Sequence, residues 1–343
     1  MRRRAVFVAI LAVLSSGLMA GSALASDVPA VSQFPLWRVA WRGPGDGLAG
    51  LSSVTAVSKS DAWAVGIRGL NAAARGYLLH WGGHRWRTKA LPATGLSPLE
   101  VGASSPTYVW VFGAYQGSGA AFRWDGSRWH KTILPVGGGG GQAAVLGPSD
   151  VWFGVPSCPT CQVMHWNGAQ WTALALPAKF VMTGLSGSGP GNFWVVGVIQ
   201  TRTGARRGQI AAYRWVAGSW SRVRMPKMGT TILAGVAAVA PANVWIVNEW
   251  SKRQRPWHWN GSHWRQLPAP PAAIGPTFLF APSGRNGIRV SAMSVWNGRR
   301  WLIGPQSFDG NAMAAVPGTS SAWMVGAWFE HSTGLTAEVR LSR

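Results

Sequence analysis

Short apolar runs separated by turn residues extend over most of the sequence, and no long stretch has the period of an amphipathic helix. The runs group into units of about four strand-like segments, divided by Gly, Pro, Asn or Asp. Each unit has an apolar strand with small residues, a Trp-x-Val-Gly strand, a variable loop and a hairpin that closes with Leu-Pro. The units recur at a spacing of about 42 residues, which predicts an all-β protein built from repeats.

Two Trp residues five positions apart mark the hairpin of each unit, in the general pattern Trp-[Asp/Asn/Gly]-Gly-x-x-Trp. Because five is odd and the hairpin loop is short, the two side chains should lie on one face of neighbouring strands, directly opposite or on a diagonal. Such aromatic pairs contribute roughly 0.5–1.5 kcal/mol beyond the area they bury. With the Trp of each second strand, they assign 18 of the 23 Trp residues to packing between units. The pairs are Trp81/Trp86, Trp124/Trp129, Trp166/Trp171, Trp215/Trp220, Trp259/Trp264 and Trp296/Trp301.

The Trp-led second strand recurs along the chain, with one degenerate copy at 287–290. The strand before it is rich in small residues, as at 54–57, 142–145 and 235–238, which suits strands that crowd a central axis. The copies of the second strand lie at 63–66, 110–113, 152–154, 194–197, 245–248 and 323–326.

Four-stranded units at this period are typical of the blades of a β-propeller. The seventh unit stops at 338–343, in its third strand, whereas residues 34–42 read like the Trp-led fourth strands of the other units. We therefore expect the N-terminal strand to complete the last blade and remove an exposed edge. The prediction is a single all-β domain over 26–343, a seven-bladed β-propeller of four-stranded blades. The blades are expected at about 48–92, 96–135, 139–177, 180–226, 230–270, 273–306 and 308–343.

The repeats resemble those of exported bacterial propellers, common in high-GC actinobacteria, whose units read Asp-Val-Trp-Ala-Val-Gly and then His-Trp-Asp-Gly-x-x-Trp. Matching copies stand at 61–66, 123–129, 150–152 and 165–168. The resemblance covers essentially all of the chain after residue 25 and implies the propeller fold, but little about function, because propellers host many activities. The hairpins also resemble, more distantly, Asp-box turns, although the Ser-x-Asp that opens that motif is missing. The paired Gly and Tyr of kelch repeats are not reproduced either.

The N-terminus has the features of a secretory signal. Three Arg residues at 2–4 precede an apolar run over 5–21, and small residues follow at 22–26, with cleavage expected after Ala25. An uncleaved anchor is the alternative, since about 17 apolar residues lie at the lower limit for crossing a bilayer. No later stretch has 18 uninterrupted apolar residues. We therefore expect an exported protein, extracellular or at the cell surface, without a transmembrane segment in the mature chain.

Cys158 and Cys161 are the two cysteines of the chain. In a cytosolic protein this Cys-x-x-Cys spacing would indicate a redox motif or half of a zinc site. Export favours a local disulfide instead. A thiol-exchange role, free thiols and a metal site remain as alternatives.

The charge is strongly unbalanced, with 32 Lys and Arg against 10 Asp and Glu and a formal net charge of +22. Without the three Arg of the predicted signal, the net charge is +19. At 47% hydrophobic residues, the chain is not a disordered polymer. Its charge predicts attraction to anionic wall polymers and nonspecific attraction to nucleic acid, both weakened by salt. A GC-rich genome and an acid habitat are alternative sources of the imbalance.

The loops that join second to third strands vary most in length and charge, as expected of binding loops on a rigid scaffold. Interleaved Arg and aromatic side chains suit sugar rings that carry acidic groups, or single-stranded nucleic acid. The alternative is that these aromatic residues only pack the bases of the loops. The candidate ligand-binding residues are Arg68, Arg75, Tyr115, Arg202, Arg206, Arg207, Trp250, Lys252, Arg253, Arg255, Trp257 and Trp328.

Catalysis has little support in the sequence. A glycosidase needs two carboxylates flanking the bond, yet Asp61, Asp125 and Asp150 stand at repeated turn positions. Six of the seven His residues lie around the outer hairpins, and no metal site or cofactor is indicated. The weak candidates for an acid or base are Glu100, Glu249 and Glu330.

Two functions follow as hypotheses. The first is a secreted, non-enzymatic binding propeller that recognises an anionic glycan, a cell-wall polymer or an envelope protein through a basic, Trp-bearing loop face. The alternative is a hydrolase or lyase that acts on polysaccharide on the same scaffold. The shortage of carboxylates favours binding over catalysis.

Overall fold

Asn, Asp and Gly residues close the hairpins that divide the chain into antiparallel strands. In the hairpin after Trp124, Asp125 Oδ1 accepts hydrogen bonds from the backbone N–H groups of Ser127 and Arg128 at 2.8 and 2.9 Å. Gly126 has a φ of 96°, a conformation in which a side chain would be strained. Asn167 and Asn260 make the same bonds in their hairpins. The [Asp/Asn]-Gly pair of the repeat is therefore a turn device.

The computed structural model describes most of the chain after its N-terminal region. The described residues are 37–44, 49–69, 74–137, 141–155, 162–189, 191–200, 208–231, 234–248, 255–268, 279–280, 288–290, 294–296, 301–303, 308–319, 321–330 and 334–341. Residues 35–343 form one compact unit.

Among the described residues, the strands pair into antiparallel four-stranded sheets, one of which has a short fifth strand. The first three sheets consist of β2 (Ala49–Ser58), β3 (Asp61–Arg68), β4 (Arg75–Trp81) and β5 (Trp86–Thr88); β6 (Ser97–Ser105), β7 (Tyr108–Tyr115), β8 (Ser118–Trp124) and β9 (Trp129–Gly137); and β10 (Gln142–Gly147), β11 (Asp150–Gly154), β12 (Val163–Trp166) and β13 (Trp171–Leu174). The next two consist of β14 (Phe180–Gly187), β15 (Phe193–Ile199), β16 (Gly208–Val216), β17 (Ser219–Arg222) and β18 (Thr230–Thr231); and β19 (Ala234–Ala240), β20 (Asn243–Asn248), β21 (Trp257–Trp259) and β22 (Trp264–Gln266).

The remaining sheets come from the C-terminal part of the chain and include the first strand. They consist of β23 (Leu279–Phe280), β24 (Ile288–Val290), β25 (Ser294–Trp296) and β26 (Trp301–Ile303); and β27 (Phe308–Ala315), β28 (Ala322–Glu330), β29 (Gly334–Leu341) and β1 (Arg38–Arg42). The predicted all-β architecture of four-stranded antiparallel units is confirmed.

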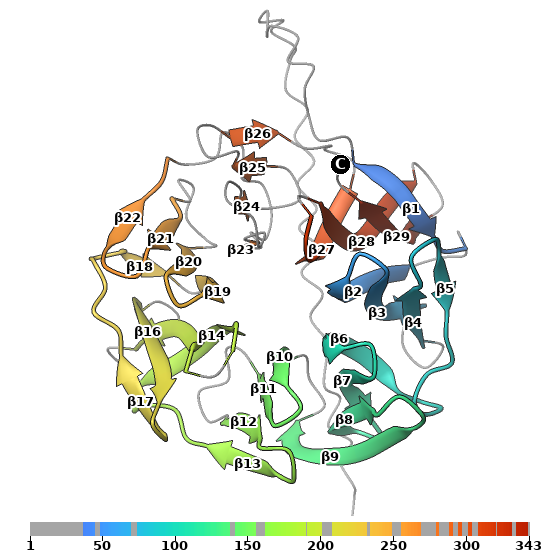
Figure 1. Cartoon of the computed structure of the whole chain (residues 1–343), viewed down its shortest axis with the longest axis horizontal. Helices are drawn as coiled ribbons and strands as arrows, with labels where there is room; N and C mark the ends of the chain where they lie inside the picture. Colours follow the sequence, from blue (N-terminus) through green and yellow to red (C-terminus); the bar gives the residue numbers. More distant parts are fainter. Residues whose placement is uncertain are drawn as a thin grey trace, which may run out of the picture. The chain divides into compact units, whose positions relative to one another are not determined.

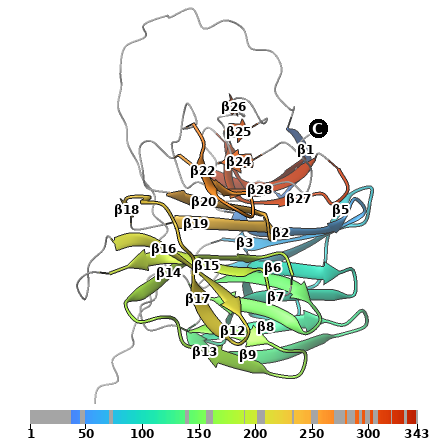
Figure 2. The ribbon, with the colours of Figure 1, turned by 60° about the vertical axis from the view of Figure 1, so that its left-hand side comes forward.

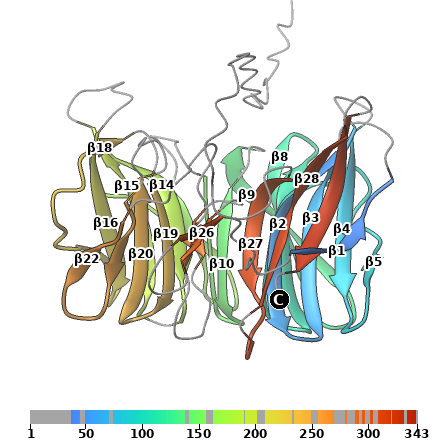
Figure 3. The ribbon, with the colours of Figure 1, turned by 90° about the horizontal axis from the view of Figure 1, so that it is seen from above.

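The first strands of the sheets surround an axis. Each contacts the first strand of the next sheet in the order β2, β6, β10, β14, β19, β23 and β27, and β27 contacts β2 again. Figure 1 shows these strands innermost and the fourth strands, such as β5, β13 and β22, at the perimeter. Seen from the side in Figure 3, and obliquely in Figure 2, the sheets stand next to one another around the ring. The prediction that strands with small residues lie at the axis is confirmed for β2, β10 and β19.

The N-terminal strand completes the last sheet, as the sequence predicts. β1 pairs antiparallel with β29, with Arg38 opposite Leu341 and Arg42 opposite Glu338. The carboxylate of Glu338 is fully buried and accepts a hydrogen bond from Arg340 Nε at 3.1 Å, while Arg42 lies 3.6 Å away. The first and last strands, β1 and β29, are thus joined by backbone hydrogen bonds and by the ion pair between Arg42 and Glu338.

The two Trp residues of each hairpin lie directly opposite each other in all six pairs. Four of the pairs whose side chains are described pack against the second-strand Trp of the preceding sheet in the ring. Trp323 of β28, for example, lies 4.9 and 5.1 Å from the rings of Trp81 and Trp86 in the first sheet. Trp110 meets Trp166 and Trp171 in the same way, at 5.5 and 5.3 Å. Inter-sheet packing therefore explains the Trp-rich repeat, as predicted.

No helix among the described residues is long and apolar enough to cross a membrane. The predicted signal at 1–25 and the cysteine pair Cys158 and Cys161 lie outside the described residues, so the cleavage and disulfide predictions remain predictions.

Candidate functional site

The connections between second and third strands lie at one end of the sheets, and the described candidates from the sequence gather there. Arg68, the last residue of β3, stands opposite Arg75, the first residue of β4, and both are exposed. Arg255 precedes β21 and is exposed, and Trp257 is the first residue of that strand and partly buried. Like charges directly opposite each other are unfavourable. The Arg68–Arg75 pair is therefore a local concentration of positive charge that hairpin stability does not require.

Tyr115 lies at the same end of its sheet and contacts residues of that sheet. Its ring meets Phe122 edge-on at 5.7 Å, and Lys131 Nζ lies 5.0 Å from the ring centre. The ring is part of the cluster around Trp63 and Val111. This arrangement agrees with the alternative that such aromatic residues pack the loop bases, while the cation above the ring adds positive charge near the loops.

For other candidates the structure describes only the backbone or nothing. Trp328 pairs with Phe308 and Thr336, and Glu330 with Gly334, in backbone register. The candidates outside the described residues are Arg202, Arg206, Arg207, Glu249, Trp250, Lys252 and Arg253.

A second set of exposed cations lies on the outermost strands and just after them, a location that the sequence did not single out. Charged residues on edge strands prevent pairing with other chains, so this set has a structural explanation. It comprises Arg38, Arg42, Arg87, Lys89, Lys131, Arg222, Arg224, Lys227 and Arg265.

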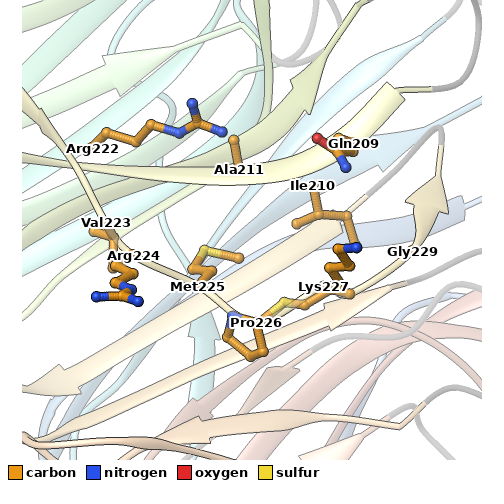
Figure 4. A pocket seen from close by; sticks show the side chains of 11 residues that line it. Gln209, Ile210, Ala211, Arg222, Val223, Arg224, Met225, Pro226, Lys227 and Gly229 are labelled. Carbon is orange, nitrogen blue, oxygen red and sulfur yellow. The ribbon is translucent and has the colours of Figure 1, made fainter.

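Three of these outer cations surround a cavity of about 550 Å³ at the edge of β16. Val223 N still donates to Ala212 O at 2.9 Å, and β18 pairs with β16 again at Gly208 and Gln209, so the chain between arches away from the strand edge. Figure 4 shows Met225, Pro226 and Lys227 on this arch, facing Ile210 and Gln209 of β16. The cavity has an apolar floor and, among its described lining residues, three cations (Arg222, Arg224, Lys227) and no acid.

Acidic side chains contrast with these cations, because internal contacts engage all five acids whose side chains are described. Asp61, Asp125 and Asp150 each accept a hydrogen bond from a His ring nitrogen. Glu338 is held by Arg340. The pKa of Asp125 lies well below its ordinary value, chiefly through the bond from His130 and then through the turn N–H groups. The fifth acid, Glu100, accepts hydrogen bonds from Ser53 and from the Ala143 backbone.

A Trp, an Asp or Asn, and a His form a recurring cluster at one end of the second strands. Asp61 accepts hydrogen bonds from Trp63 Nε1 at 3.1 Å and from His80 Nε2 at 3.0 Å, and the His80 ring lies on the Trp63 ring at 4.1 Å. The prediction that Asp61 and Asp150 are only turn residues was incomplete, since each also accepts a hydrogen bond from a Trp indole N–H and orients a His ring. The equivalent clusters are Asp150/Trp152/His165 and Asn243/Trp245/His258. In the β14–β18 sheet, Trp194 Nε1 donates to Asn192, and Arg214 lies over the Trp ring.

Glu100 lies at the axis, in a cavity of about 290 Å³ lined by the innermost strands. Polar side chains of these strands also reach it, among them Ser52, Gln142 and Asn311. Each bonds to the backbone of the next innermost strand: Asn311 Nδ2 donates to Leu51 O at 2.9 Å, Ser52 Oγ to Leu99 O at 2.8 Å, and Gln142 Oε1 accepts from Leu185 N at 3.0 Å. These bonds link neighbouring sheets around the axis.

Burial raises the pKa of Glu100 to about 8, although hydrogen bonds from the Ser53 hydroxyl and the Ala143 N–H favour the ionised form. The residue is half-buried and lines the axial cavity. At neutral pH Glu100 is therefore mostly a neutral carboxylic acid that can donate a hydrogen bond.

Several solved structures resemble the chain over most of its length. YCF48 bound to D1 peptide has a TM-score of 0.59 and 16% identity, over 92% of this chain and 97% of that chain. A catalytically inactive virginiamycin B lyase from Staphylococcus aureus with quinupristin has a TM-score of 0.64 and 12% identity, over 90% and 100%. The WD40 β-propeller domain of Doa1 has a TM-score of 0.58 and 10% identity, over 90% and 97%. The chain has a β-propeller fold.

At these identities the likeness extends to the fold alone. No family model matches the propeller's sequence, and no curated protein matches it significantly. In the described part of the propeller, no group of three or more His, Cys, Asp or Glu side chains lies close enough to hold a metal ion.

Gln142, Asn311 and Ser52 were not among the candidates from the sequence. Their signal is faint but present, since each is a polar residue in a strand otherwise rich in small side chains. The sequence could not show that they share one cavity with Glu100. Each comes from a different sheet, and the ring arrangement of the sheets brings them together.

Proposed function

We propose that this propeller is an exported, non-enzymatic binding protein that holds an anionic glycan or cell-wall polymer on its basic loop face. The observation that carries the proposal is the contrast between its charges. All five acids whose side chains are described are engaged in internal contacts, and Arg68, Arg75 and Arg255 are exposed at the ends of second and third strands.

Electrostatics explains why such a face would collect an extended anion. A polymer with regularly spaced negative charges contacts several cations at once, and each contact releases counterions. Arg presents a planar fork of donors that matches carboxylate and phosphate groups. The candidates outside the described residues, Arg202, Arg206, Arg207, Lys252 and Arg253, would add to the same face because they belong to second-to-third-strand loops.

Three finer predictions belong to this proposal. The ring has seven blades, the short strands β23–β26 forming the sixth. Residues 1–25 direct export, so the propeller works outside the cytoplasm. The repeats relate the chain to exported actinobacterial propellers.

A protein partner at the cell envelope is the alternative occupant of the loop face, and YCF48, whose structure holds a D1 peptide, supports it by analogy of fold.

The competing function is a polysaccharide hydrolase or lyase, and Glu100 is the observation that favours it. A carboxyl with a pKa of about 8, located in a cavity, is suited to proton transfer at neutral pH. Glycoside hydrolysis needs a second carboxylate, and Glu100 is the one acid among the described residues of that cavity. Glycan turnover that disappears in Glu100→Gln would support this function over binding.

Retention on an immobilised anionic polysaccharide tests the binding proposal. The variant with Arg206, Arg207, Arg253 and Arg255 changed to Ser should elute at a clearly lower salt concentration than the unmodified protein, because four polymer contacts are lost. Circular dichroism checks that the variant is folded. Unchanged elution of a folded variant would refute the loop face as the binding surface.

A further inference from the structure

Glu100 occupies a position at which five of the other innermost strands have small side chains. In those sheets this position lies opposite the residue just before the Gly or Asn that ends the second-strand repeat, Trp-x-Val-Gly in its usual form. Glu100 lies opposite Phe112 there. The equivalent residues are Ser53, Ala143, Gly184, Gly235 and Ala312. The repeat therefore does not require a carboxyl group at this place, and its presence needs another explanation.

The polar groups around Glu100 retain hydrogen-bonding capacity. Gln142 accepts through Oε1, which leaves its Nε2 group as a donor, and Asn311 donates through Nδ2, which leaves Oδ1 as an acceptor. Glu100, protonated, adds a hydroxyl donor. Ser52, Ser53 and glycine backbone also line the cavity, together with apolar residues such as Val54 and Leu185, so its lining is more polar than apolar. Donors and an acceptor from three different sheets thus face a common space, as a ligand with several polar groups requires.

Charge narrows the class of ligand. Although the chain has 32 Lys and Arg, none lines this cavity among the described residues, so an anion would find no partner there. The positive field of the whole protein opposes entry of a cation. The cavity of about 290 Å³ lies at the lower end of the range of ligand pockets, which suits one ring and not a chain.

We propose that the axial cavity binds a small, uncharged ligand rich in hydroxyl groups, such as a single hexose ring, through hydrogen bonds from Glu100 and Gln142 and to Asn311. This site is separate from the loop face and does not depend on the function proposed for it.

Binding should depend on pH, because Glu100 donates its hydrogen bond only when protonated. The strands packed against β6 are β2, β3, β4, β7 and β10. β2 and β10 contain no titratable residue, and the causes of the raised pKa include no charged side chain. The titratable residues of the other packed strands are Asp61, Arg68, Arg75, Tyr77, His80, Tyr108 and Tyr115. The affinity should therefore follow Glu100, and fall as the pH rises above about 8.

Saturation-transfer NMR with D-glucose, D-galactose and D-mannose tests the proposal on the full chain. At least one of the three should bind at pH 6.5, and its affinity should fall by roughly tenfold or more at pH 9.5. Glu100→Gln keeps a donor of similar shape, so this variant should still bind and lose the pH dependence. Glu100→Ala should not bind, and Asp61→Asn, far from the axis, should behave like the unmodified protein.

Three results would overturn the proposal: no binding of any of the three hexoses at pH 6.5, binding that persists in Glu100→Ala, or binding that strengthens as the pH rises. The last would indicate that the ionised carboxylate accepts hydrogen bonds from the sugar hydroxyls, and that the protonated acid does not donate one. If Glu100→Ala fails to fold, the pH profile of Glu100→Gln decides, because a profile equal to that of the unmodified protein excludes Glu100.

Discussion

At the scale of single residues, the acceptor two positions before a second-strand Trp has a precise geometric task. Asp61 bonds both Trp63 and His80, and Asn243 bonds Trp245 and His258 in the same way, with distances of 2.7 and 3.0 Å. An amide oxygen thus replaces a carboxylate within one chain. The oxygen, and not the charge, is what the cluster needs.

Asp61→Ala should lower the free energy of unfolding by about 1–3 kcal/mol, because the buried indole N–H of Trp63 loses its acceptor. Asp61→Asn should change it by less than about 0.5 kcal/mol, since Asn243 performs the same role. Urea unfolding followed by Trp fluorescence measures both. Equal losses in the two variants would mean that the charge of Asp61 matters more than its hydrogen bonds.

Glu100 affects stability through its raised pKa. The folded protein holds the proton up to a pH of about 8, whereas the unfolded chain releases it near 4.5. Stability from this group is therefore fully present below pH 4.5 and is lost as the pH rises to about 8, at about 1.4 kcal/mol per pH unit at most.

Glu100→Gln removes this titration. Its stability relative to the unmodified protein should be similar at pH 4.5 and should rise steadily toward pH 8, as measured by urea midpoints at several pH values. A constant difference between the two proteins across this range would show that Glu100 is not a buried neutral acid.

At the scale of elements, the sequence predicted the hairpins because these are local, and it left their registers between a directly opposite and a diagonal placement of the two Trp residues. Trp81 and Trp86 face each other since the turn between them has a fixed length, and β1 joins β29 because one unit lacks a fourth strand. The bonds between His80 and Asp61, or from Ser53 and Ala143 to Glu100, connect residues far apart in sequence. Their partners become known only when the strands and sheets are placed side by side.

The closing strand gives a prediction of its own. Glu338→Ala should lower the free energy of unfolding by roughly 3–5 kcal/mol, because it leaves the buried Arg340 without its carboxylate. Arg42→Ala, which removes the more exposed partner at 3.6 Å, should cost less than about 1 kcal/mol. Chemical denaturation of both variants measures the difference. Comparable losses would mean that the contact from Arg42 on β1 to Glu338 stabilises the fold as much as the contact from Arg340 within β29.

At the scale of the whole molecule, strand order divides the connections between two faces. Second-to-third-strand connections lie on one face, with Arg68, Arg75 and Arg255, and the remaining turns within the sheets lie on the opposite face, where other exposed cations stand. The sequence predicted from strand order alone which loops share a face, whereas binding at the first face stays a prediction. It did not predict the cations of the outermost strands, or the cavity beside β16, which depends on how the chain after β17 returns to the strand edge.

The central proposal is that the loop face, and not the net charge, binds an anionic polymer. Two triple variants with the same loss of charge separate these explanations. One changes Arg68, Arg75 and Arg255 to Ser on the loop face. The other changes Lys59, Arg85 and Arg128 to Ser in exposed turns of the opposite face.

The deciding measurement is the affinity of both variants for one soluble anionic polysaccharide, titrated at several salt concentrations. The loop-face variant should bind roughly ten- to a hundredfold more weakly and with a smaller salt dependence, since three contacts of about 0.5–1 kcal/mol each are lost. The opposite-face variant should bind nearly as well as the unmodified protein. Equal weakening in both variants would contradict the proposal and leave only nonspecific attraction by net charge.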